Sequence, residues 1–484
     1  MWSLPPALYE AHTALRETVA IAQSDPWRPA FHFMPPSGWM NDPNGTVYHG
    51  GYYHLFYQHN PYADYWHNLH WGHARSRDLV SWEHVPIALL PRPELGEKSF
   101  YSGSCQVDGS GRPMIFYTRV DTDSEHPREQ CAAISDDDMI DWSRHTENPL
   151  ITVRDGCPPV KTNWRDPFVF QTERRTFMVL SAQLTEEAGG DYVVLLFEAQ
   201  DASLEHWEYR NVIMRKPGYT FGFFECPNFF RVGDDWVLLA SPFKPVEYYV
   251  GAFDLETCEF TPRSHGTLDG GIDFYATNTA TAPDGRTVVF AWVRGFRKGR
   301  GWNGCLALPR EISIGDDGSV GTRPVREVGK LRREQVEGEP QAISETEILL
   351  SRTTPLNVAE IECRFELGTA SSVELRLLRS ADGRTGVNIV YDGDTLDVHG
   401  TKIFYEPAND DGAITLRVFV DRSVLEVFVD DGRASVTKVV YASDDGAGVS
   451  LRARGGEATL QGFRAWRLAA CPAVPEGGIE FARE

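Results

Sequence analysis

Apolar residues near the start of the chain recur at helical spacing. Between residues 5 and 23 they occupy one face of a helix, and Asp25-Pro26 then ends the pattern. The positions on this face are Leu8, Ala11, Leu15, Val19 and Ala22. From Trp27 onward, short aromatic or β-branched runs alternate with turns rich in Gly, Asp and Asn. The pattern predicts a short N-terminal helical extension over residues 1–26, followed by an all-β chain.

A turn followed by a strand-like run recurs five times before residue 300. Successive copies begin about 50 to 60 residues apart, which leaves room for about four short strands with their loops. That is the content of one propeller blade, so the repeat predicts a five-bladed β-propeller over residues 27–325. The five copies are GGYYHLFYQ at Gly50, GRPMIFYT at Gly111, ERRTFMVLS at Glu173, GDDWVLLAS at Gly233 and DGRTVVFAW at Asp284.

The pattern changes after Arg310-Glu311. A charged, glycine-containing stretch follows, and we expect a linker over residues 326–340. Beyond it, runs such as ITLRVFV and SVLEVFV alternate apolar and polar residues and are separated by turns such as DGR and DDG. This alternation is typical of an antiparallel β-sandwich, which we place at residues 341–484. Its expected role is packing, assembly or ancillary binding.

A polar motif precedes each copy of the repeat by 7 to 12 residues. Equivalent offsets in equivalent blades predict that the motifs meet at one mouth of the central channel. Most Asp-Pro and Asp-Gly pairs are ordinary turns, but the matched offsets favour a functional site. The motifs are NDPNG with Asp42, YSGS with Ser104, WRDP with Asp166, FEC with Glu225 and DFYA with Asp273.

Three of these acids, Asp42, Asp166 and Glu225, have the chemistry that cleavage of an acetal requires. One carboxyl protonates the leaving oxygen and a second attacks or stabilises the oxocarbenium-like carbon. Crowding and partial burial raise a carboxyl pKa, which supplies the acid. A separation of about 5 to 5.5 Å would give retention and about 6.5 to 9.5 Å inversion, and the sequence leaves both open.

Aromatic and amide side chains around the same motifs predict a sugar pocket. Aromatic rings stack on the apolar faces of a sugar, while amides and guanidinium groups bind its hydroxyls. Each aromatic taken alone is more often a packing residue, but the set lies beside three acids. The stacking candidates are Trp39, Trp66, Tyr101, Tyr275 and Trp292, and the hydroxyl-binding candidates are Asn41, Gln58 and Arg165.

The composition narrows the possible partners. A formal net charge of -22, with only short basic patches, disfavours nucleic acid and anionic membranes and favours a neutral small molecule. No signal peptide or spanning helix is recognisable, so we expect a cytoplasmic protein, monomeric or homodimeric. The 8 cysteines are scattered singly, which favours reduced thiols over a disulfide framework. We expect no metal and no cofactor.

Together these motifs resemble glycoside hydrolase family 32, which contains invertases, fructan hydrolases and related fructosyltransferases. The resemblance covers nearly the whole chain after residue 27. Its motifs in the first domain are HFMPPSGWMNDPNG, HLFYQHNPY, YSGS, WRDPFVF, FFECPNFF, DFYA and LPREISI. It continues in the second domain at VDRSVLEVFVDDGRASVTKVVY.

The resemblance implies a five-bladed propeller followed by a β-sandwich, and a retaining reaction on a terminal β-fructofuranosyl unit. It implies that Asp42 is the nucleophile, Glu225 the acid/base, and Asp166 the transition-state stabiliser acting with Arg165. It also implies a fructosyl subsite formed by Asn41, Gln58, Trp66 and Ser102, with looser matches at Asp273 and Trp292.

Some residues depart from the family pattern or lie outside it. Tyr101, Phe224 and Asn228 stand where the family more often has Phe, Trp and Asp, and the departures bring the acceptor preference into question. A basic run, RGFRKGRGW, follows the fifth repeat. It could select a phosphorylated sucrose or could be a solvated loop.

The first functional hypothesis is a hydrolase of sucrose and of short fructo-oligosaccharides. A fructosyltransferase or an exo-acting hydrolase of inulin or levan would use the same three acids. An inverting arabinan-type hydrolase matches the motifs poorly. A non-catalytic carbohydrate-binding propeller is the alternative from a different class, and the presence of all three carboxylates disfavours it.

Overall fold

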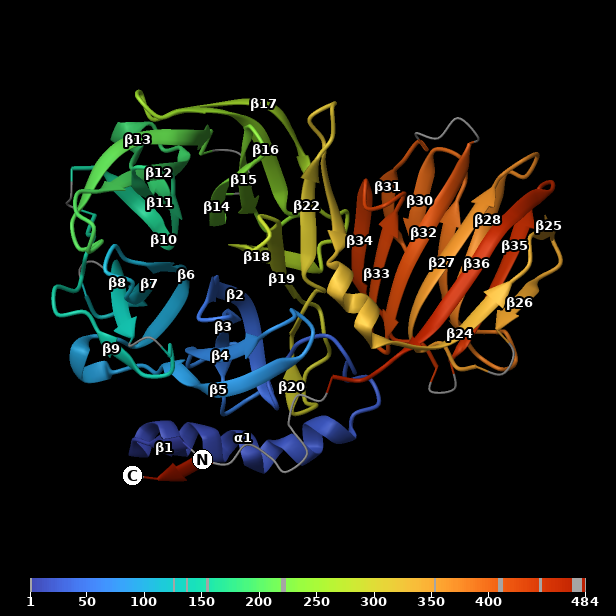
Figure 1. Ribbon diagram of the computed structural model, residues 1–484, viewed down its shortest axis with the longest axis horizontal. Coiled ribbons are helices and arrows are strands. Elements are labelled where there is room, and N and C mark those ends of the chain that lie inside the picture. The colour runs from blue at the N-terminus through green and yellow to red at the C-terminus, as the bar shows by residue number, and fades with distance from the viewer. Residues whose placement is uncertain are drawn as a thin grey trace.

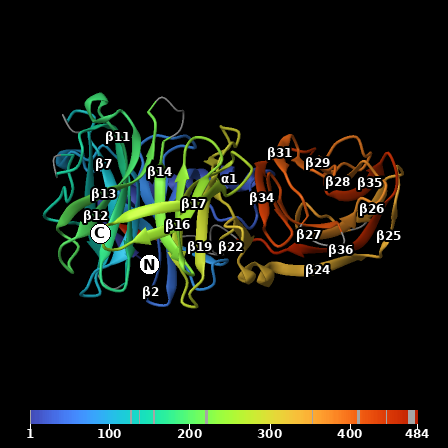
Figure 2. The same ribbon diagram turned by 90° about the horizontal axis from the view of Figure 1, so that it is seen from above.

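A computed structural model describes residues 2–124, 127–135, 138–153, 156–218, 223–351, 354–407, 412–443, 446–471 and 481–483. The chain forms two lobes that lie side by side (Figures 1 and 2). One lobe is a ring of sheets around a common centre, and the other is a pair of larger sheets. Among the described residues, no helix is long and apolar enough to span a membrane.

The described residues of the first lobe form five sheets, which are the blades of the propeller (Figure 1). In sheet order, the first blade consists of β20 (Trp302–Asn303), β2 (Gly38–His49), β3 (Tyr52–Asn60), β4 (His70–Ser76) and β5 (Trp82–Leu89). The second consists of β6 (Ser99–Val107), β7 (Pro113–Val120), β8 (Arg128–Ser135) and β9 (Trp142–Arg144). The third consists of β10 (Val160–Gln171), β11 (Thr176–Leu184), β12 (Tyr192–Ala199) and β13 (Trp207–Lys216).

The last two blades follow in the same order along the chain. The fourth consists of β14 (Glu225–Val232), β15 (Asp235–Ser241), β16 (Glu247–Asp254) and β17 (Glu259–Thr267). The fifth consists of β18 (Phe274–Thr281), β19 (Thr287–Val293), β22 (Arg310–Ile314) and β23 (Val320–Pro324), with β21 (Cys305–Leu306) beside β19. Strand β20, which lies in the chain between β19 and β22 of the fifth blade, pairs with β2, so the fifth blade is joined to the first and the ring is closed.

The five repeated runs of the sequence are equivalent strands. They form β3, β7, β11, β15 and β19, each the second strand of its blade in chain order. Three polar motifs lie on the preceding strands β2, β6 and β10, and the other two, FEC and DFYA, begin one residue before β14 and β18. The repeat therefore predicted the correct blade structure.

Each innermost strand loses its regular pairing with the second strand near one end. The breaks in register fall between Met40 and Pro43 in β2 and between Tyr101 and Gly103 in β6. Equivalent breaks interrupt β10, β14 and β18. Such irregularities redirect side chains and are common beside active sites. The skipped residues include Asp42, Ser102 and Asp166.

Side chains and backbone groups close to these breaks bond across all five blade boundaries. A buried backbone N–H or C=O that lacks a ladder partner must be bonded elsewhere, and a neighbouring blade supplies the partner. In order around the ring, the bonds are Thr46 N to Asn278 Oδ1 (2.9 Å), Gly103 N to Asn44 Oδ1 (3.3 Å), Val169 N to Ser104 Oγ (2.9 Å), Cys226 N to Asp166 Oδ2 (3.1 Å) and Asn228 Nδ2 to the Thr277 carbonyl (2.9 Å). The inner strands are thus tied into one closed ring.

The N-terminal helix α1 (Pro6–Ser24) covers the outer edge of the first blade. Leu8, Ala11 and Leu15 on its buried face pack against Ile87 of the edge strand β5. The Ile87 amide donates a hydrogen bond to His12 Nε2 at 3.2 Å. The helix therefore shields a strand edge that would otherwise be open to pairing with another chain. Strand β1 (Trp2–Leu4) pairs in parallel with β37 (Phe481–Arg483), so the two ends of the chain meet.

The second lobe is a sandwich of two sheets with one shared core (Figure 2). The first sheet contains β24 (Arg332–Gly338), β25 (Gln341–Ile343), β36 (Ala458–Leu468), β27 (Val358–Glu366), β32 (Ala413–Asp421), β33 (Val424–Val429) and β34 (Ala434–Val439). The second contains β26 (Ile348–Ser351), β35 (Gly448–Arg454), β28 (Ser372–Arg379), β29 (Val387–Tyr391), β30 (Thr395–Val398) and β31 (Thr401–Phe404).

The expected linker at residues 326–340 is structured instead. It contains the 3-10 helix η3 (Arg326–Leu331) and strand β24, which pairs with β36. Of the charged residues that gave this stretch the composition of a linker, Arg326, Glu327 and Lys330 pair with side chains of the propeller. Arg332 stacks on Trp466 at 3.9 Å and bonds both oxygens of the buried Glu360. The sandwich sheet therefore begins at Arg332, inside the expected linker.

A buried cluster of charges joins the two lobes. His32 Nδ1 lies 2.8 Å from Asp421 Oδ2, and His32 Nε2 lies 2.8 Å from Glu426 Oε1. Arg310 bonds Glu426 and, at 2.8 Å, Asp269 Oδ2. These side chains are inaccessible to solvent. Because a carboxylate only accepts hydrogen bonds, both ring nitrogens of His32 must donate, which requires the protonated imidazolium.

The pKa of His32 reflects this arrangement. Burial alone would lower it, but the bonds to Asp421 and Glu426 outweigh burial and raise the pKa to about 9. Because the pKa of His32 is higher in the folded state than in the unfolded state, His32 stabilises the fold most below about pH 6.5. That contribution is lost as the pH rises through about 9.

We expect the free energy of unfolding to fall by up to roughly 3 kcal/mol between about pH 6.5 and 9. Urea titrations at a series of pH values measure it. A His32→Gln variant should be less stable at pH 6.5 and should lack this decline. A His70→Gln variant is the control, because burial lowers the pKa of His70 to about 4 and keeps it neutral over this range. Parallel declines in wild type and His32→Gln would contradict the assignment.

Candidate active site

A cavity of about 400 Å³ lies where the breaks in the inner strands converge. All five blades contribute to its wall, so residues far apart in the sequence share one concave surface. The lining residues are Trp39, Asn41, Asp42, Gln58, Trp66, Tyr101, Ser102, Arg165, Asp166, Glu225, Phe243, Tyr275, Trp292 and Arg294. The combination of three carboxylates with aromatic rings and amides is suited to a sugar.

Asp42 is held from both sides by neutral donors. Asn41 Nδ2 donates to its Oδ1 at 3.0 Å, and Ser102 Oγ donates to its Oδ2 at 2.5 Å. Gln58 joins these partners, because its Oε1 accepts from Asn41 Nδ2 at 2.7 Å and its Nε2 donates to Ser102 Oγ at 2.8 Å. Trp39 Nε1 completes the network at Asn41 Oδ1. The carboxylate is therefore fixed in orientation without an ion pair.

Asp166 is fixed by its backbone as well as by its side chain. Its φ is 62°, in the left-handed region, and Pro167 follows it. Its amide donates to Thr118 Oγ1 at 3.0 Å, and its Oδ2 accepts from the Cys226 amide at 3.1 Å. Arg165 Nε lies 3.4 Å from the same oxygen. Burial, as the largest effect, raises the pKa of Asp166, although Arg165 opposes this.

Glu225 lies between a guanidinium and a phenol. Arg165 Nη2 donates to Glu225 Oε1 at 2.6 Å, and the Tyr275 hydroxyl donates to Oε2 at 2.5 Å. Burial and the charges of Asp166 and Asp42 raise the pKa of Glu225 to about 7, against the opposing effect of Arg165 and the Tyr275 hydrogen bond. Glu225 is therefore poised to give and take a proton near neutral pH.

Cys226 lies between the acids but does not have the character of a nucleophile. Its Sγ lies 3.6 Å from Asp42 Oδ2. Burial and the surrounding carboxylates hold the pKa of the thiol well above its ordinary value, so it stays protonated. Within the described part of the chain, no group of three or more His, Cys, Asp or Glu side chains could hold a metal ion.

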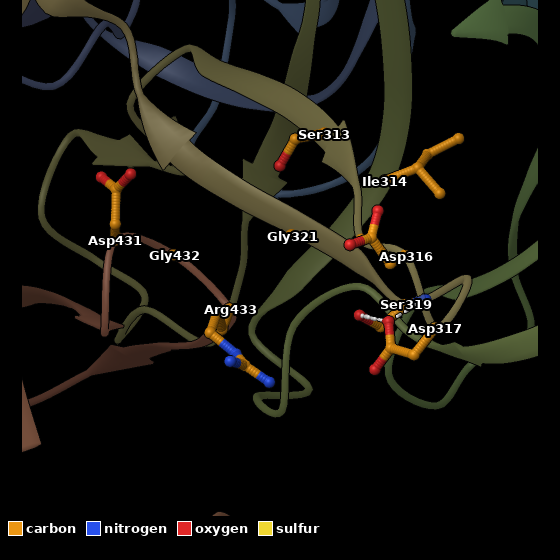
Figure 3. A pocket seen from close by; sticks show the side chains of 10 residues that line it. Ser313, Ile314, Asp316, Asp317, Ser319, Gly321, Asp431, Gly432 and Arg433 are labelled. Carbon is orange, nitrogen blue, oxygen red and sulfur yellow. Dashed lines mark hydrogen bonds between the residues drawn. The ribbon is translucent and has the colours of Figure 1, made fainter. Parts of the chain in front are cut away.

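A second cavity, of about 410 Å³, lies at the contact between the lobes (Figure 3). It is formed by the turn between β22 and β23 and the turn between β33 and β34. Its acids belong to turns, where Asp317 Oδ1 accepts from Ser319 Oγ at 2.6 Å. Its lining contains no aromatic residue, and the Asp431 carboxyl, which pairs with Arg323 at 2.9 Å, is 75% exposed. The cavity of the propeller is therefore the candidate active site.

Two family models match this chain. The model of the glycosyl hydrolases family 32 N-terminal domain matches residues 32–324, and that of the family 32 C-terminal domain matches residues 327–467. The chain belongs to glycosyl hydrolase family 32. The two matched regions correspond to the propeller and the sandwich.

Relatives whose names state an activity match this chain over almost its whole length. A sucrose-6-phosphate hydrolase of Zymomonas mobilis is 31% identical over 506 residues, covering 95% of this chain and 96% of the relative. A raffinose invertase of Escherichia coli is 33% identical, covering 95% and 98%. A β-fructofuranosidase of Bombyx mori, solved with sucrose, has a TM-score of 0.80 and 26% identity, and the match covers 97% of this chain and 99% of that one.

The structure brings together all but one of the predicted site residues of this family 32 chain. Asp42, Asp166 and Glu225 line one cavity, as do the predicted Asn41, Gln58, Trp66, Tyr101, Ser102, Arg165, Tyr275 and Trp292. Asp273 does not line the cavity. Its Oδ2 accepts a hydrogen bond from the Val439 amide of the sandwich at 2.9 Å. Its position therefore supports a role in joining the lobes instead of binding sugar.

Two of the three departures from the family pattern also lie away from the cavity. Phe224 is fully buried in the core between blades, and Asn228 is buried beneath the acids. Asn228 Nδ2 donates to the carbonyls of Cys226 at 3.0 Å and Thr277 at 2.9 Å, which an aspartate could not do. Only Tyr101, among the three, faces the substrate space.

Phe243 is the lining residue that the sequence did not indicate. It follows the fourth repeated strand, has a φ of 60° and is 47% exposed. Its ring stacks on Tyr275 with centroids 5.6 Å apart, and its amide donates to the Tyr275 hydroxyl at 2.9 Å. Its place in the sequence could have indicated it. It lies two residues beyond β15, and β15 pairs with β14, which carries Glu225.

We expect kcat/KM to fall as the pH rises above about 7, because Glu225 must be protonated to act as an acid. The Tyr275 hydrogen bond lowers the pKa of Glu225, so Tyr275→Phe should move this limb of the pH profile to higher pH. The control is Tyr249→Phe, which removes a similar bond to Glu247 at 2.8 Å outside the cavity. A Tyr275→Phe profile that stays in place or moves to lower pH would contradict this account.

Proposed function

We propose that the protein is a retaining β-fructofuranosidase, which hydrolyses the terminal β-D-fructofuranosyl unit of sucrose and of short fructo-oligosaccharides. The observation that carries the proposal is one cavity that holds Asp42 between neutral donors and Glu225 with a pKa of about 7. The names of the family relatives, sucrose-6-phosphate hydrolase and raffinose invertase, support a sucrose unit in the substrate.

The proposed reaction has two displacements at the anomeric carbon, C2. Asp42 attacks C2 while Glu225 gives its proton to the leaving oxygen, so the C2–O bond breaks as the Asp42–C2 bond forms. Glu225 then takes a proton from water, whose oxygen attacks C2 and releases Asp42. Asp166 and Arg165 bind fructosyl hydroxyls during both steps. Because each step inverts C2, the released fructose retains its configuration.

The cavity wall supports binding of a small neutral ring. Trp39 and Trp292 meet edge to face with centroids 5.6 Å apart, and Trp66 is 52% exposed. Such partly exposed rings can pack on the apolar faces of a sugar. We expect the protein to act as a monomer or as a homodimer.

We infer a cytoplasmic location. In the part of the chain that the structure describes, no disulfide joins the cysteines. Six of the eight are buried, and burial raises the thiol pKa of several of them, including Cys105, Cys131 and Cys363. This usage of cysteine is typical of proteins from a reducing compartment.

Replacement of Glu225 by Gln should reduce kcat for sucrose by about 10² to 10⁴-fold, because the proton donor is lost while the shape is kept. Asp42→Asn should abolish the covalent step and lower kcat at least as much. Release of reducing sugar measures both. Glu247→Gln, in the same blade but outside the cavity, is the matched control and should retain its rate. Undiminished cleavage by Glu225→Gln would reject the acid/base assignment.

Hydrolysis and transfer differ only in the acceptor of the fructosyl unit. We expect free fructose and free glucose to appear in equal amounts during sucrose turnover, with the first fructose formed in the β configuration. Chromatography of the products and NMR of the first turnovers measure these outcomes. A large deficit of fructose would favour a fructosyltransferase, and an α-configured first product would reject the retaining mechanism.

A further inference from the structure

The loop between β3 and β4, residues 61–69, carries the cavity residue Trp66 and buries few of its own side chains. Tyr62, Tyr65 and Trp66 are 46%, 51% and 52% exposed. A loop with so little packing is mobile unless hydrogen bonds fix its backbone. The position of Trp66, and with it one wall of the sugar pocket, therefore depends on such bonds.

Hydrogen bonds fix both ends of this loop. At the end of β3, the buried Asn60 donates from its Nδ2 to the Tyr65 carbonyl at 3.0 Å, and its Oδ1 accepts from the Tyr62 amide at 3.1 Å. At the start of β4, His70 Nδ1 lies 2.8 Å from the Asn68 carbonyl. The tip of the loop is held in a different way.

Asp64 joins the tip of the loop to a glycine-rich segment, residues 299–301. Its Oδ2 accepts hydrogen bonds from the amides of Gly299 at 2.8 Å, Arg300 at 2.8 Å and Gly301 at 3.2 Å. The two glycines have φ values of 80° and 75°, in the left-handed region, so three successive amides converge on one oxygen. A concavity of backbone N–H groups binds an anion well, and these bonds are strengthened by the charge of the carboxylate.

The segment that receives Asp64 is held by other parts of the molecule. Arg300 forms an ion pair with Asp25 Oδ1 at 2.7 Å, and Trp302 Nε1 donates to Asp25 Oδ2 at 2.9 Å. Because Asp25 directly follows helix α1, the N-terminal extension supports this segment. On the other side, the Arg297 amide donates to the hydroxyl of Tyr441 in the sandwich at 3.0 Å. Asp64 thus ties a surface loop to a part of the chain that is fixed independently.

The same contacts show what the basic run at residues 294–300 does. The sequence left open whether it is an anion site or a solvated loop. An anion does bind there, but it is a carboxylate of the protein itself and it is bound by backbone amides. The guanidinium of Arg297 lies over the Tyr441 ring, 4.0 Å from its centroid, and that of Arg300 pairs with Asp25.

Trp66 differs from the other tryptophans of the cavity in how it is placed. Trp39 and Trp292 contact each other, and Trp39 Nε1 also donates to Asn41 Oδ1 at 2.7 Å. Among the described residues, none stacks on the Trp66 ring or bonds to its indole N–H. Its position is therefore set by the backbone of the loop, which Asp64 fixes two residues earlier.

We propose that Asp64 is a positioning residue of the active site, which acts through Trp66 on the binding of the substrate sugar. This inference rests on the proposed function, because it requires a sugar in the cavity. Asp64 does not line the cavity, so it acts without touching the substrate. A ring that packs on a sugar binds the ground state and the transition state alike, so its displacement should raise KM more than it lowers kcat.

The test measures KM and kcat for sucrose separately. Asp64→Ala should raise KM by about 10-fold and change kcat by less than about 2-fold. Asp64→Asn keeps an oxygen that can accept the amides and should restore most of the wild-type KM. The control is Asp254→Ala, which removes an aspartate that accepts the amides of Glu256 at 2.7 Å and Thr257 at 3.1 Å in a turn outside the cavity. It should keep the wild-type KM.

A double variant tests whether Asp64 acts through Trp66. Trp66→Ala should raise KM by itself, and adding Asp64→Ala to it should raise KM no further, because the effects of two residues that act through one contact are not additive. Thermal unfolding checks that each variant is folded.

Three outcomes would overturn the inference while sucrose hydrolysis by wild type left the proposed function standing. They are a wild-type KM in Asp64→Ala, a loss in kcat alone, as a smaller folded fraction would give, and additive effects on KM in the double variant. A wild type that cleaves no sucrose would reject the proposed function and this inference with it.

Discussion

The active site depends on the need to satisfy backbone groups where five inner strands leave their regular pairing. At each break the chain frees polar groups inside the ring, where they must find partners. Groups of the next blade supply them, so the bonds that satisfy the breaks also join the blades. One of these side chains also lines the cavity. Asp166 accepts the amide of Cys226 and so fixes the residue next to Glu225.

This constraint explains how the acids are preorganised. Asp166, Cys226 and Ala276 all have φ values near 50 to 60°, at equivalent places in three successive blades. The left-handed backbone is costly for such residues and is retained only where the surroundings enforce it. The result is a cluster of carboxyls whose environments differ. Burial raises the pKa of both Glu225 and Asp42, but Glu225 lies between a guanidinium and a phenol, while hydrogen bonds from Ser102 and Asn41 oppose the rise in the pKa of Asp42. Differing environments of this kind are what the proposed roles of Glu225 as acid and Asp42 as nucleophile require.

The sandwich takes part in the site without lining it. It holds Asp273 through the Val439 amide, and the Tyr441 hydroxyl accepts from the Arg297 amide at 3.0 Å. These two contacts fix both ends of the segment that carries Tyr275 and Arg294. The buried cluster around His32 and Arg310 secures the lobes to each other. This arrangement explains why the acid of the fifth motif was misjudged, since its offset is right but its carboxylate turns toward the other lobe.

The sequence by itself determined the blade repeat, the sandwich strands and the three acids, because strand periodicity and turn chemistry are local and recur at a constant spacing. It indicated most of the residues that line the cavity for the same reason. Only the tertiary structure decided which side of a strand faces the cavity, since a break in register redirects a side chain without changing the local composition. It therefore decided that Phe243 and Arg294 line the site, that Asp273 does not, and that the charged stretch at Arg332 is a sheet strand. Those outcomes depend on partners hundreds of residues away, which pattern and propensity do not describe.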